Sequence, residues 1–231
     1  MGDVLVSFPS TPHLVWLSDE AIRGDKLLGT AARVRLLAGT VVVEEKIDGA
    51  NVGIAVDDDD RVIAWNRNTK LGPGAHPQFE PLWPWLANRS AGFRKTLGRD
   101  LVLFGEWCFA RHSVEYTRLP DWWMLFDVWD RRVSRFWSTT RRDALGHELG
   151  LSVVPQVARG RFDVAGIQAL LGRSRVGDAP MEGLYVRSDD GVHETGRAKI
   201  VRAEFTQAIG EHWTRRSVRK NRLNPVAVAR T

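Results

Sequence analysis

The stretch from Val41 to Val56, VVVEEKIDGANVGIAV, places a lysine, an aspartate and a glycine between two apolar runs. Apolar, β-branched runs predict buried strands, so Lys46 should lie at a strand end. A protonated lysine amine is a poor nucleophile, and apolar and cationic neighbours lower its pKa towards neutrality. We therefore expect Lys46 to attack a phosphorus or carbonyl centre. Gly49 should let the chain turn tightly and a ligand approach closely, and Asp48 should orient cations or hydroxyls beside the lysine.

A KxDG string alone is a weak signal, because an ordinary surface lysine at a hairpin produces it by chance. Further chemistry-bearing residues, however, follow on or beside other expected strands. In chain order they are Arg67 in WNRNTKL, Glu106 in LFGEW, Phe126 in MLFDVWD, Glu182 in MEGLYVR, and Arg197 and Lys199 in GRAKIVR. Alone, Phe126 is typical of a core aromatic in a buried strand, so its assignment depends on the order and spacing of the whole series.

This ordered series resembles the covalent nucleotidyltransferases, the superfamily of ATP-dependent DNA ligases, RNA ligases and mRNA capping enzymes. The resemblance extends from about Val41 to Arg202. EKIDGAN, FGEW and MEGLYVR are most similar to the ATP-dependent RNA ligases, particularly the branch typified by the second phage RNA ligase. Phe8 to Leu14, FPSTPHL, resembles the N-terminal strip of RNA-ligase-like proteins. The resemblance implies an α+β nucleotidyltransferase (ATP-grasp-like) fold, with mainly antiparallel sheets flanked by helices.

The resemblance also implies a three-step reaction. The lysine attacks the α-phosphate of ATP to give lysyl-AMP with loss of pyrophosphate, AMP passes to a 5′-phosphate end, and a 3′-hydroxyl displaces AMP and seals the strand. Negative charge that develops on the phosphates calls for cationic clamps and a divalent metal, Mg²⁺ or Mn²⁺. The substrate would be RNA ends or a nicked duplex, with DNA as a further possibility and an end-healing protein as a possible partner.

By resemblance, Lys46 is the nucleophile, Glu106 holds the ribose hydroxyls and Phe126 stacks on adenine. Arg67 would contact the ribose or phosphate side, and Glu182 would act through the metal beside the lysine.

The phosphate clamp would come from Arg197 and Lys199, which alternate on one strand face. The family usually has two lysines in this motif. Arginine keeps the charge and binds phosphate bidentately, so we expect function to be retained with altered phosphate geometry.

The elements expected around these motifs are mostly strands, which favours an α+β class. A hairpin joins NVGIAV to RVIAWN through the acidic run 57–60, which is typical of a solvated turn rather than a metal site. Further strands are expected over 100–108, 121–130, 135–137, MEGLYVRS and RAKIVR. Helices are expected around Pro81–Asn88, over 139–151 behind a threonine cap, over 163–173 behind Asp163, and over 203–213. The tryptophans are expected mainly in the core rather than on nucleic-acid bases.

The chain of 231 residues carries a net charge of +5, which favours anionic partners without identifying one. Its single cysteine, Cys108, excludes an internal disulfide, and we expect it to be buried. No long apolar segment is present, so a soluble, cytoplasmic protein with no membrane partner is expected. We expect one adenylation domain over 1–213 and a basic C-terminal tail over 214–231, with no OB-fold or separate C-terminal domain.

Two basic segments could bind a phosphate backbone. ARHSVEYTR contains Arg111 and Arg118, and the terminal segment contains Arg215, Arg216, Arg219, Lys220 and Arg222. A solvated tail explains the terminal segment equally well. Beside an RNA ligase, two other functions stay open: a DNA ligase or GTP-dependent capping enzyme, and a non-catalytic RNA-binding module that retains the fold.

Overall fold

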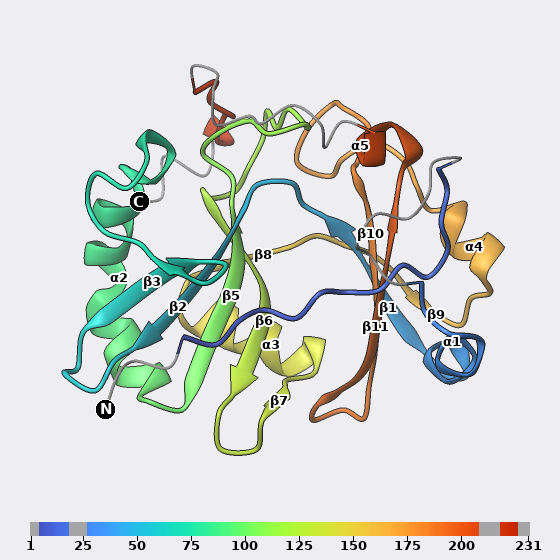
Figure 1. Cartoon of the computed structure of the whole chain (residues 1–231), viewed down its shortest axis with the longest axis horizontal. Coiled ribbons are helices and arrows are strands. Elements are labelled where there is room, and N and C mark those ends of the chain that lie inside the picture. The colour runs from blue at the N-terminus through green and yellow to red at the C-terminus, as the bar shows by residue number, and fades with distance from the viewer. Residues whose placement is uncertain (1–4, 19–26, 208–217, 226–231) are drawn as a thin grey trace.

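The computed structural model describes residues 5–18, 27–207 and 218–225, which form two β-sheets (Figure 1). The smaller sheet has the strand order β11-β10-β1-β9. Its strands are β1 (Val41–Lys46), β9 (Gln156–Gly160), β10 (Gly183–Asp189) and β11 (Glu194–Val201). Every strand pair in this sheet is antiparallel.

The larger sheet has the order β4-β3-β2-β5-β6-β7, with β8 pairing beside β6. Its strands are β2 (Ala50–Val56), β3 (Val62–Asn66), β4 (Thr69–Lys70), β5 (Leu101–Trp107), β6 (Trp123–Asp130), β7 (Arg135–Phe136) and β8 (Ser152–Val153). Within the described part of the chain, only the short β6–β8 pair in this sheet is parallel. The expected α+β class with mainly antiparallel sheets is therefore confirmed, although the sequence did not indicate β4, β8 or β9.

The helices are α1 (Thr30–Leu37), α2 (Leu82–Leu97), α3 (Thr139–Glu148), α4 (Val164–Gln168) and α5 (Ala203–Gln207), together with the 3-10 turn η1 (Pro77–Phe79). Helices α1, α2 and α3 pack against the sheets, and α5 lies at one end of β10 and β11 (Figure 1). Helix α2 packs on β2 and β3 and is longer than expected, because Phe93 and Leu97 continue its buried face beyond Asn88.

Side-chain caps begin two of these helices. Asp163 caps α4 as predicted, since its carboxylate accepts a hydrogen bond from the Gly166 backbone N–H at 2.7 Å. The predicted threonine cap of α3 is wrong: Ser138 is the cap and accepts from the Arg141 N–H, and Thr139 is the first helical residue. The expected helix over 203–213 is described only as far as Gln207.

The acidic run 57–60 is a turn between β2 and β3, as predicted. Asp57 is buried and accepts hydrogen bonds from the backbone N–H groups of Asp59 and Arg61, so it shapes the turn. The three aspartates after it are exposed.

The core contains most of the tryptophans that could have stacked on nucleic-acid bases. Trp85 and Trp123 are buried, and Trp83 and Trp122 are half-buried against the same core. Cys108 is fully buried, as expected. No helix in the described ranges has the length and apolar character needed to cross a lipid bilayer.

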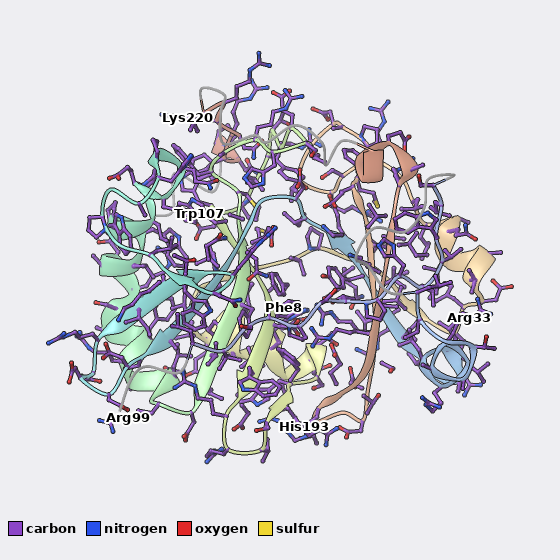
Figure 2. The ribbon with its side chains drawn as sticks, viewed as in Figure 1. Phe8, Arg33, Arg99, Trp107, His193 and Lys220 are labelled. Atoms are coloured by element: carbon purple, nitrogen blue, oxygen red, sulfur yellow. The ribbon has the colours of Figure 1, made fainter. Side chains whose placement is uncertain are left out.

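The N-terminal segment connects the two sheets. Phe8 lies near the middle of the molecule (Figure 2), with its ring about 5 Å from those of Phe104 and Phe126 on the larger sheet. A few residues later, the Leu14 N–H donates to the Lys199 carbonyl on β11 at 2.8 Å. The segment that resembles the N-terminal strip of RNA ligases therefore joins both sheets beside the predicted adenine and phosphate residues.

Candidate active site

The KIDG turn, residues 46–49, is where the chain leaves one sheet and enters the other. Lys46 is the last residue of β1 in the smaller sheet, and Ala50 is the first of β2 in the larger one. Both strands are almost entirely buried, which holds the turn at a fixed place. The predicted strand-end position of Lys46 is therefore confirmed.

Gly49 is required in this turn by a close backbone approach. A Cβ atom at this position would lie 2.5 Å from the Trp107 carbonyl oxygen on β5. This oxygen belongs to the backbone of a central strand, so it cannot shift without disturbing the sheet. Gly49 therefore permits a close approach of the turn to β5.

A pocket opens beside the turn, between the two sheets. Its walls come from β1, β2, β5, β6 and β10 and the residues next to them. It is lined by Glu44, Glu45, Lys46, Ile47, Asn51, Glu106, Phe126, Val154, Tyr185 and Arg187. Three of the predicted site residues, Lys46, Glu106 and Phe126, thus share one pocket although they are far apart in sequence.

Lys46 forms an ion pair with Glu182 at the edge of this pocket. The lysine Nζ donates to Glu182 Oε2 at 2.6 Å, and the two side chains are only 20% and 13% exposed. Sheet register explains the pairing: Lys46 lies opposite Gly183, the first residue of β10, so Glu182 immediately precedes that strand. Two motifs 136 residues apart are joined in this way.

The expectation of a lowered lysine pKa is wrong. Burial alone would lower the pKa of Lys46, but the nearby Glu182, Tyr185, Glu106 and Asp48 raise it above its ordinary value. The surroundings of this lysine are acidic, whereas the sequence-based argument assumed cationic neighbours. Lys46 is therefore an ammonium in the resting protein and must lose its proton before it can act as a nucleophile.

Two carboxyl groups near Lys46 titrate close to neutral pH. Burial raises the pKa of Glu106 to about 8, although Lys46 opposes the shift. Burial also raises the pKa of Glu182 to about 7, and Lys46 and Lys199 oppose it. Glu106 is held in place because its Oε1 accepts a hydrogen bond from the Gly49 N–H at 3.0 Å. At neutral pH both carboxyl groups are therefore partly protonated.

Asp48 fixes the turn to a neighbouring loop. Its Oδ2 accepts hydrogen bonds from the backbone N–H groups of Ser113 and Val114, at 2.6 and 2.9 Å. The Asp48 N–H in turn donates to the hydroxyl of the fully buried Tyr116 at 2.7 Å. Tyr116 could not be recognised as a site residue from the sequence, because a lone tyrosine in a loop belongs to no motif.

The other predicted residues lie at different distances from the pocket. Lys199 pairs in register with Tyr185 of the pocket wall, and its charge acts on Glu182. Arg67 is exposed in the turn after β3 and is not among the lining residues. It directly follows Asn66, whose side chain donates to the carbonyl of the lining residue Asn51 at 2.7 Å. Arg67 thus lies at the same end of the larger sheet as the pocket.

Arg197 belongs to a buried ionic network behind the pocket. It is paired with Asp127 at 3.0 Å and with Glu194, its side chain is 9% exposed, and its guanidinium lies 4.0 Å from the ring centroid of Phe136. Arg187, which lines the pocket, also pairs with Asp127, at 2.9 Å. The structure therefore places Lys199 beside the Lys46–Glu182 pair, and Arg197 within the supporting network.

Glu44 extends this network to the far side of the pocket. It accepts hydrogen bonds from Arg187 at 2.8 Å and from both terminal nitrogens of Arg142 on α3. Arg142 also donates to the carbonyl of Phe126 at 2.8 Å. The sequence feature that could have indicated this network is the acidic Glu44 inside the apolar run VVVEEK. A carboxylate in a buried strand needs a partner of opposite charge in the core.

The site offers donors and acceptors for an anionic ligand with a cation. Across the described residues, the Nη2 atoms of Arg187 and Arg197 are buried without a hydrogen-bond partner. No group of three or more histidine, cysteine or acidic residues in the same ranges is arranged to hold a metal ion. Glu182 can therefore fit a divalent cation only as one ligand among several, with the others coming from ligand oxygens or water.

Several solved structures of one enzyme have a similar architecture. The structure of Naegleria gruberi RNA ligase with PPi matches with a TM-score of 0.60 and 19% identity, covering 90% of this chain and 60% of that one. A mutant of that ligase with ATP and Mn matches with a TM-score of 0.57 and 19% identity, covering 75% and 52%. A mutant with AMP and Mn matches with a TM-score of 0.58 and 17% identity, covering 87% and 63%.

These likenesses show that the chain has the fold of an RNA ligase, which confirms the nucleotidyltransferase fold expected from its sequence. The chain spans between 52% and 63% of the length of these three structures.

The family profile for RNA ligase matches residues 39–201. The chain therefore belongs to the RNA ligase family, as its motifs indicated. Comparison with curated proteins gave no significant match.

Proposed function

We propose that this protein is an ATP-dependent RNA ligase that joins 5′-phosphate and 3′-hydroxyl ends through lysyl-AMP. The observation that carries the proposal is the Lys46–Glu182 pair at the crossing of the two sheets, beside a pocket that also contains Glu106 and Phe126. Membership of the RNA ligase family supports the reaction class. The ATP, AMP, PPi and Mn found with the Naegleria ligase support the choice of ATP and a divalent metal.

In the proposed reaction, Lys46 Nζ forms a bond to the α-phosphorus of ATP and pyrophosphate leaves. Phe126 would lie against the adenine, because it forms one apolar wall of the pocket. Glu106 would accept hydrogen bonds from the ribose hydroxyls with the oxygen that the Gly49 N–H leaves free. Asp48 acts as a positioning residue, since its carboxylate is committed to the neighbouring loop.

The attack requires Lys46 to release a proton. Glu182 lies 2.6 Å from Nζ and stabilises the ammonium, so this stabilisation must be weakened before the proton can leave to solvent. Mg²⁺ or Mn²⁺ bound with Glu182 as one ligand would weaken the hold of this carboxylate on the ammonium and stabilise the charge on the phosphates. Lys199 would bind the phosphates, and the free Nη2 atoms of Arg187 and Arg197 are further donors. Arg67, in its exposed turn, would approach the nucleotide from the outer side.

RNA with a nick or a break is the substrate we propose, and a DNA strand is a second candidate that the same chemistry would allow. A separate end-healing protein would supply ends of the required kind. We also propose a single adenylation domain over 1–213. The pocket that both sheets line supports this proposal. The basic segment over 214–231 follows this domain, and its residues 218–225 pack against it.

The test is incubation with α-labelled ATP, or with α-labelled GTP in parallel, and Mg²⁺ or Mn²⁺, followed by denaturing electrophoresis. Label from ATP that is retained by the protein and absent from Lys46→Ala would support lysyl-AMP formation. A second assay then measures sealing of a nicked RNA duplex and of the matched DNA duplex. Label from GTP alone would favour capping chemistry. Absence of label from both nucleotides, in folded protein not already adenylated, would contradict the proposal and favour an RNA-binding module.

A further inference from the structure

Two basic segments about a hundred residues apart lie side by side at one end of the molecule. The Arg111 N–H donates to the Arg219 carbonyl at 2.7 Å, and the Arg222 N–H donates to the Tyr116 carbonyl at 2.9 Å. Lys220 lies at the top of the view in Figure 2, at the end where the 108–119 loop lies in Figure 1. Residues 218–225 therefore run along the loop 108–119. Arg215 and Arg216, which the sequence also indicated, lie outside the described residues.

Asn221 anchors this contact. Its side chain is 3% exposed, accepts a hydrogen bond from the Tyr116 N–H at 2.9 Å, and donates to the Cys108 carbonyl at 2.8 Å. With the asparagine directed inwards, the neighbouring Arg219, Lys220 and Arg222 are exposed. The backbone that carries these three cations is thus fixed, which lowers the entropy that an anionic ligand must overcome in binding them.

The resulting surface carries an excess of positive charge. It consists of Arg111, Arg118, Arg219, Lys220 and Arg222, and we call it the strap surface. Two carboxylates lie among these cations. Glu115 is shared by Arg111 at 2.9 Å and Arg222 at 3.6 Å, and Asp178 pairs with Arg118 at 2.7 Å. Because these pairs are solvent-exposed, they hold the cations weakly and leave them available to a polyanion.

The strap surface is joined directly to the nucleophile's turn. The loop that carries Arg111 and Arg118 also supplies the Ser113 and Val114 N–H groups that bind Asp48, two residues after Lys46. A strand that crosses this surface therefore arrives at the edge of the lysine pocket. Several exposed cations on a fixed backbone can bind the phosphates of a nucleic-acid backbone.

We propose that the strap surface binds the phosphate backbone of the RNA whose end is presented to Lys46. This inference rests on the proposed ligase function for the identity of the polymer. Recognition here is of the phosphates and not of the bases, because the surface offers cations rather than a stacked row of exposed aromatic rings.

The test compares two triple variants in direct RNA binding. The first is Arg219→Gln, Lys220→Gln and Arg222→Gln, which leaves Asn221 and the loop 108–119 unchanged. The matched control is Arg94→Gln, Arg99→Gln and Arg132→Gln, three cations that are also exposed and weakly paired. Arg99 and Lys220 lie far apart on the molecule (Figure 2). The probe is a fluorescently labelled, nicked RNA duplex with a 5′-phosphate, measured by anisotropy without ATP over a series of salt concentrations.

We expect the first variant to bind the probe at least about tenfold more weakly, with the slope of log K against log salt reduced by roughly 2. The control should stay within about twofold of the wild type. An unchanged affinity and slope in the first variant, an equal loss in the control, or a wild type that does not bind the probe would each overturn the inference.

A second readout separates this inference from the proposed function. Lysyl-AMP formation with labelled ATP and no RNA reports on the lysine pocket, and melting curves report on the fold. Normal lysyl-AMP with normal RNA binding in the first variant would refute only the strap surface. Loss of lysyl-AMP in the wild type would refute the ligase proposal, while the binding comparison would still test the surface.

Discussion

Glu44 pairs with both Arg142 and Arg187 in the charged network of the pocket, so its replacement by glutamine tests this network directly. Glu44 is 1% exposed, and its two partners Arg142 and Arg187 are 3% and 2% exposed. Removing one member of a buried ion pair costs about 3–5 kcal/mol, because a charge is left buried without compensation. Glu44→Gln keeps the shape of the side chain and removes only the charge.

The remaining contacts place the expected loss at the lower end of that range. Arg187 keeps Asp127 and Glu194, and Arg142 keeps the half-exposed Asp143 and the Phe126 carbonyl. We therefore expect the free energy of unfolding to fall by about 3 kcal/mol, and the melting temperature by roughly 6–12 °C.

Urea denaturation at pH 7, followed by tryptophan fluorescence, measures this loss. The control is Asp59→Asn, which removes a carboxylate from the exposed pair with Arg61 and should change the stability by less than about 0.5 kcal/mol. A loss below about 1 kcal/mol for Glu44→Gln, with an unchanged m-value, would refute the argument that this network stabilises the fold.

The stability of the protein should also depend on pH through Glu44. Burial raises the pKa of Glu44, but the charges and hydrogen bonds of Arg142 and Arg187 outweigh it, so the pKa is lowered below 4.5 in the folded protein. The stabilisation is therefore present above the unfolded pKa and is lost as the pH falls through the lower folded pKa. The difference in stability between the wild type and Glu44→Gln should narrow on acidification below about pH 4.5. A constant difference down to pH 3 would contradict this account.

Three further variants test the turn that carries the nucleophile. Glu106→Gln should stabilise the fold more at pH 9 than at pH 5, because the pKa of this carboxyl is raised to about 8 and its ionisation at higher pH therefore destabilises the folded protein. The same variant should bind nucleotide more weakly. Melting curves at both pH values measure the first effect, and titration with ATP measures the second. Gly49→Ala should cost about 1–3 kcal/mol in urea unfolding, because its Cβ would meet the Trp107 carbonyl at 2.5 Å, and a loss under 0.5 kcal/mol would show that the turn can relax. Tyr116→Phe should cost about 1–3 kcal/mol and slow lysyl-AMP formation, because the Asp48 N–H loses its acceptor; normal rates would show that this hydrogen bond does not position the turn.

Local patterns in the sequence were sufficient to predict the main strands and the order of the motifs. β-Branched runs predicted β1 and β2. The acidic run between Val56 and Val62 predicted the hairpin turn that joins β2 to β3. Asp163 was predicted as a cap because its side chain acts on a backbone N–H only three residues away. Short-range effects of this kind depend on neighbours in the chain, so they can be inferred without the fold.

The electrostatic state of the site could not be inferred in this way. Lys46 was expected to have cationic neighbours and a lowered pKa, but the register between β1 and β10 places Glu182 against it and raises its pKa. Lys199 and Arg197 are alternate residues on one strand, and Arg197 is paired with Asp127 and Glu194 in the supporting network. The ion pairs of the site are determined by strand pairing between residues that are far apart in the sequence.

What the sequence alone determined is therefore the set of reactive residues and the strands that carry them: a lysine in a KIDG turn, acids and cations in a fixed order, and an RNA ligase family pattern. Only the tertiary structure decided which of these residues meet, that the resting lysine is charged, and that residues 218–225 lie along the loop that holds Asp48. The physical reason is that propensity and capping act within a few residues. The ion pair Glu44–Arg187, between residues 143 apart, exists only after β1 and β10 have paired, and Arg187–Asp127 exists only after the two sheets have packed together.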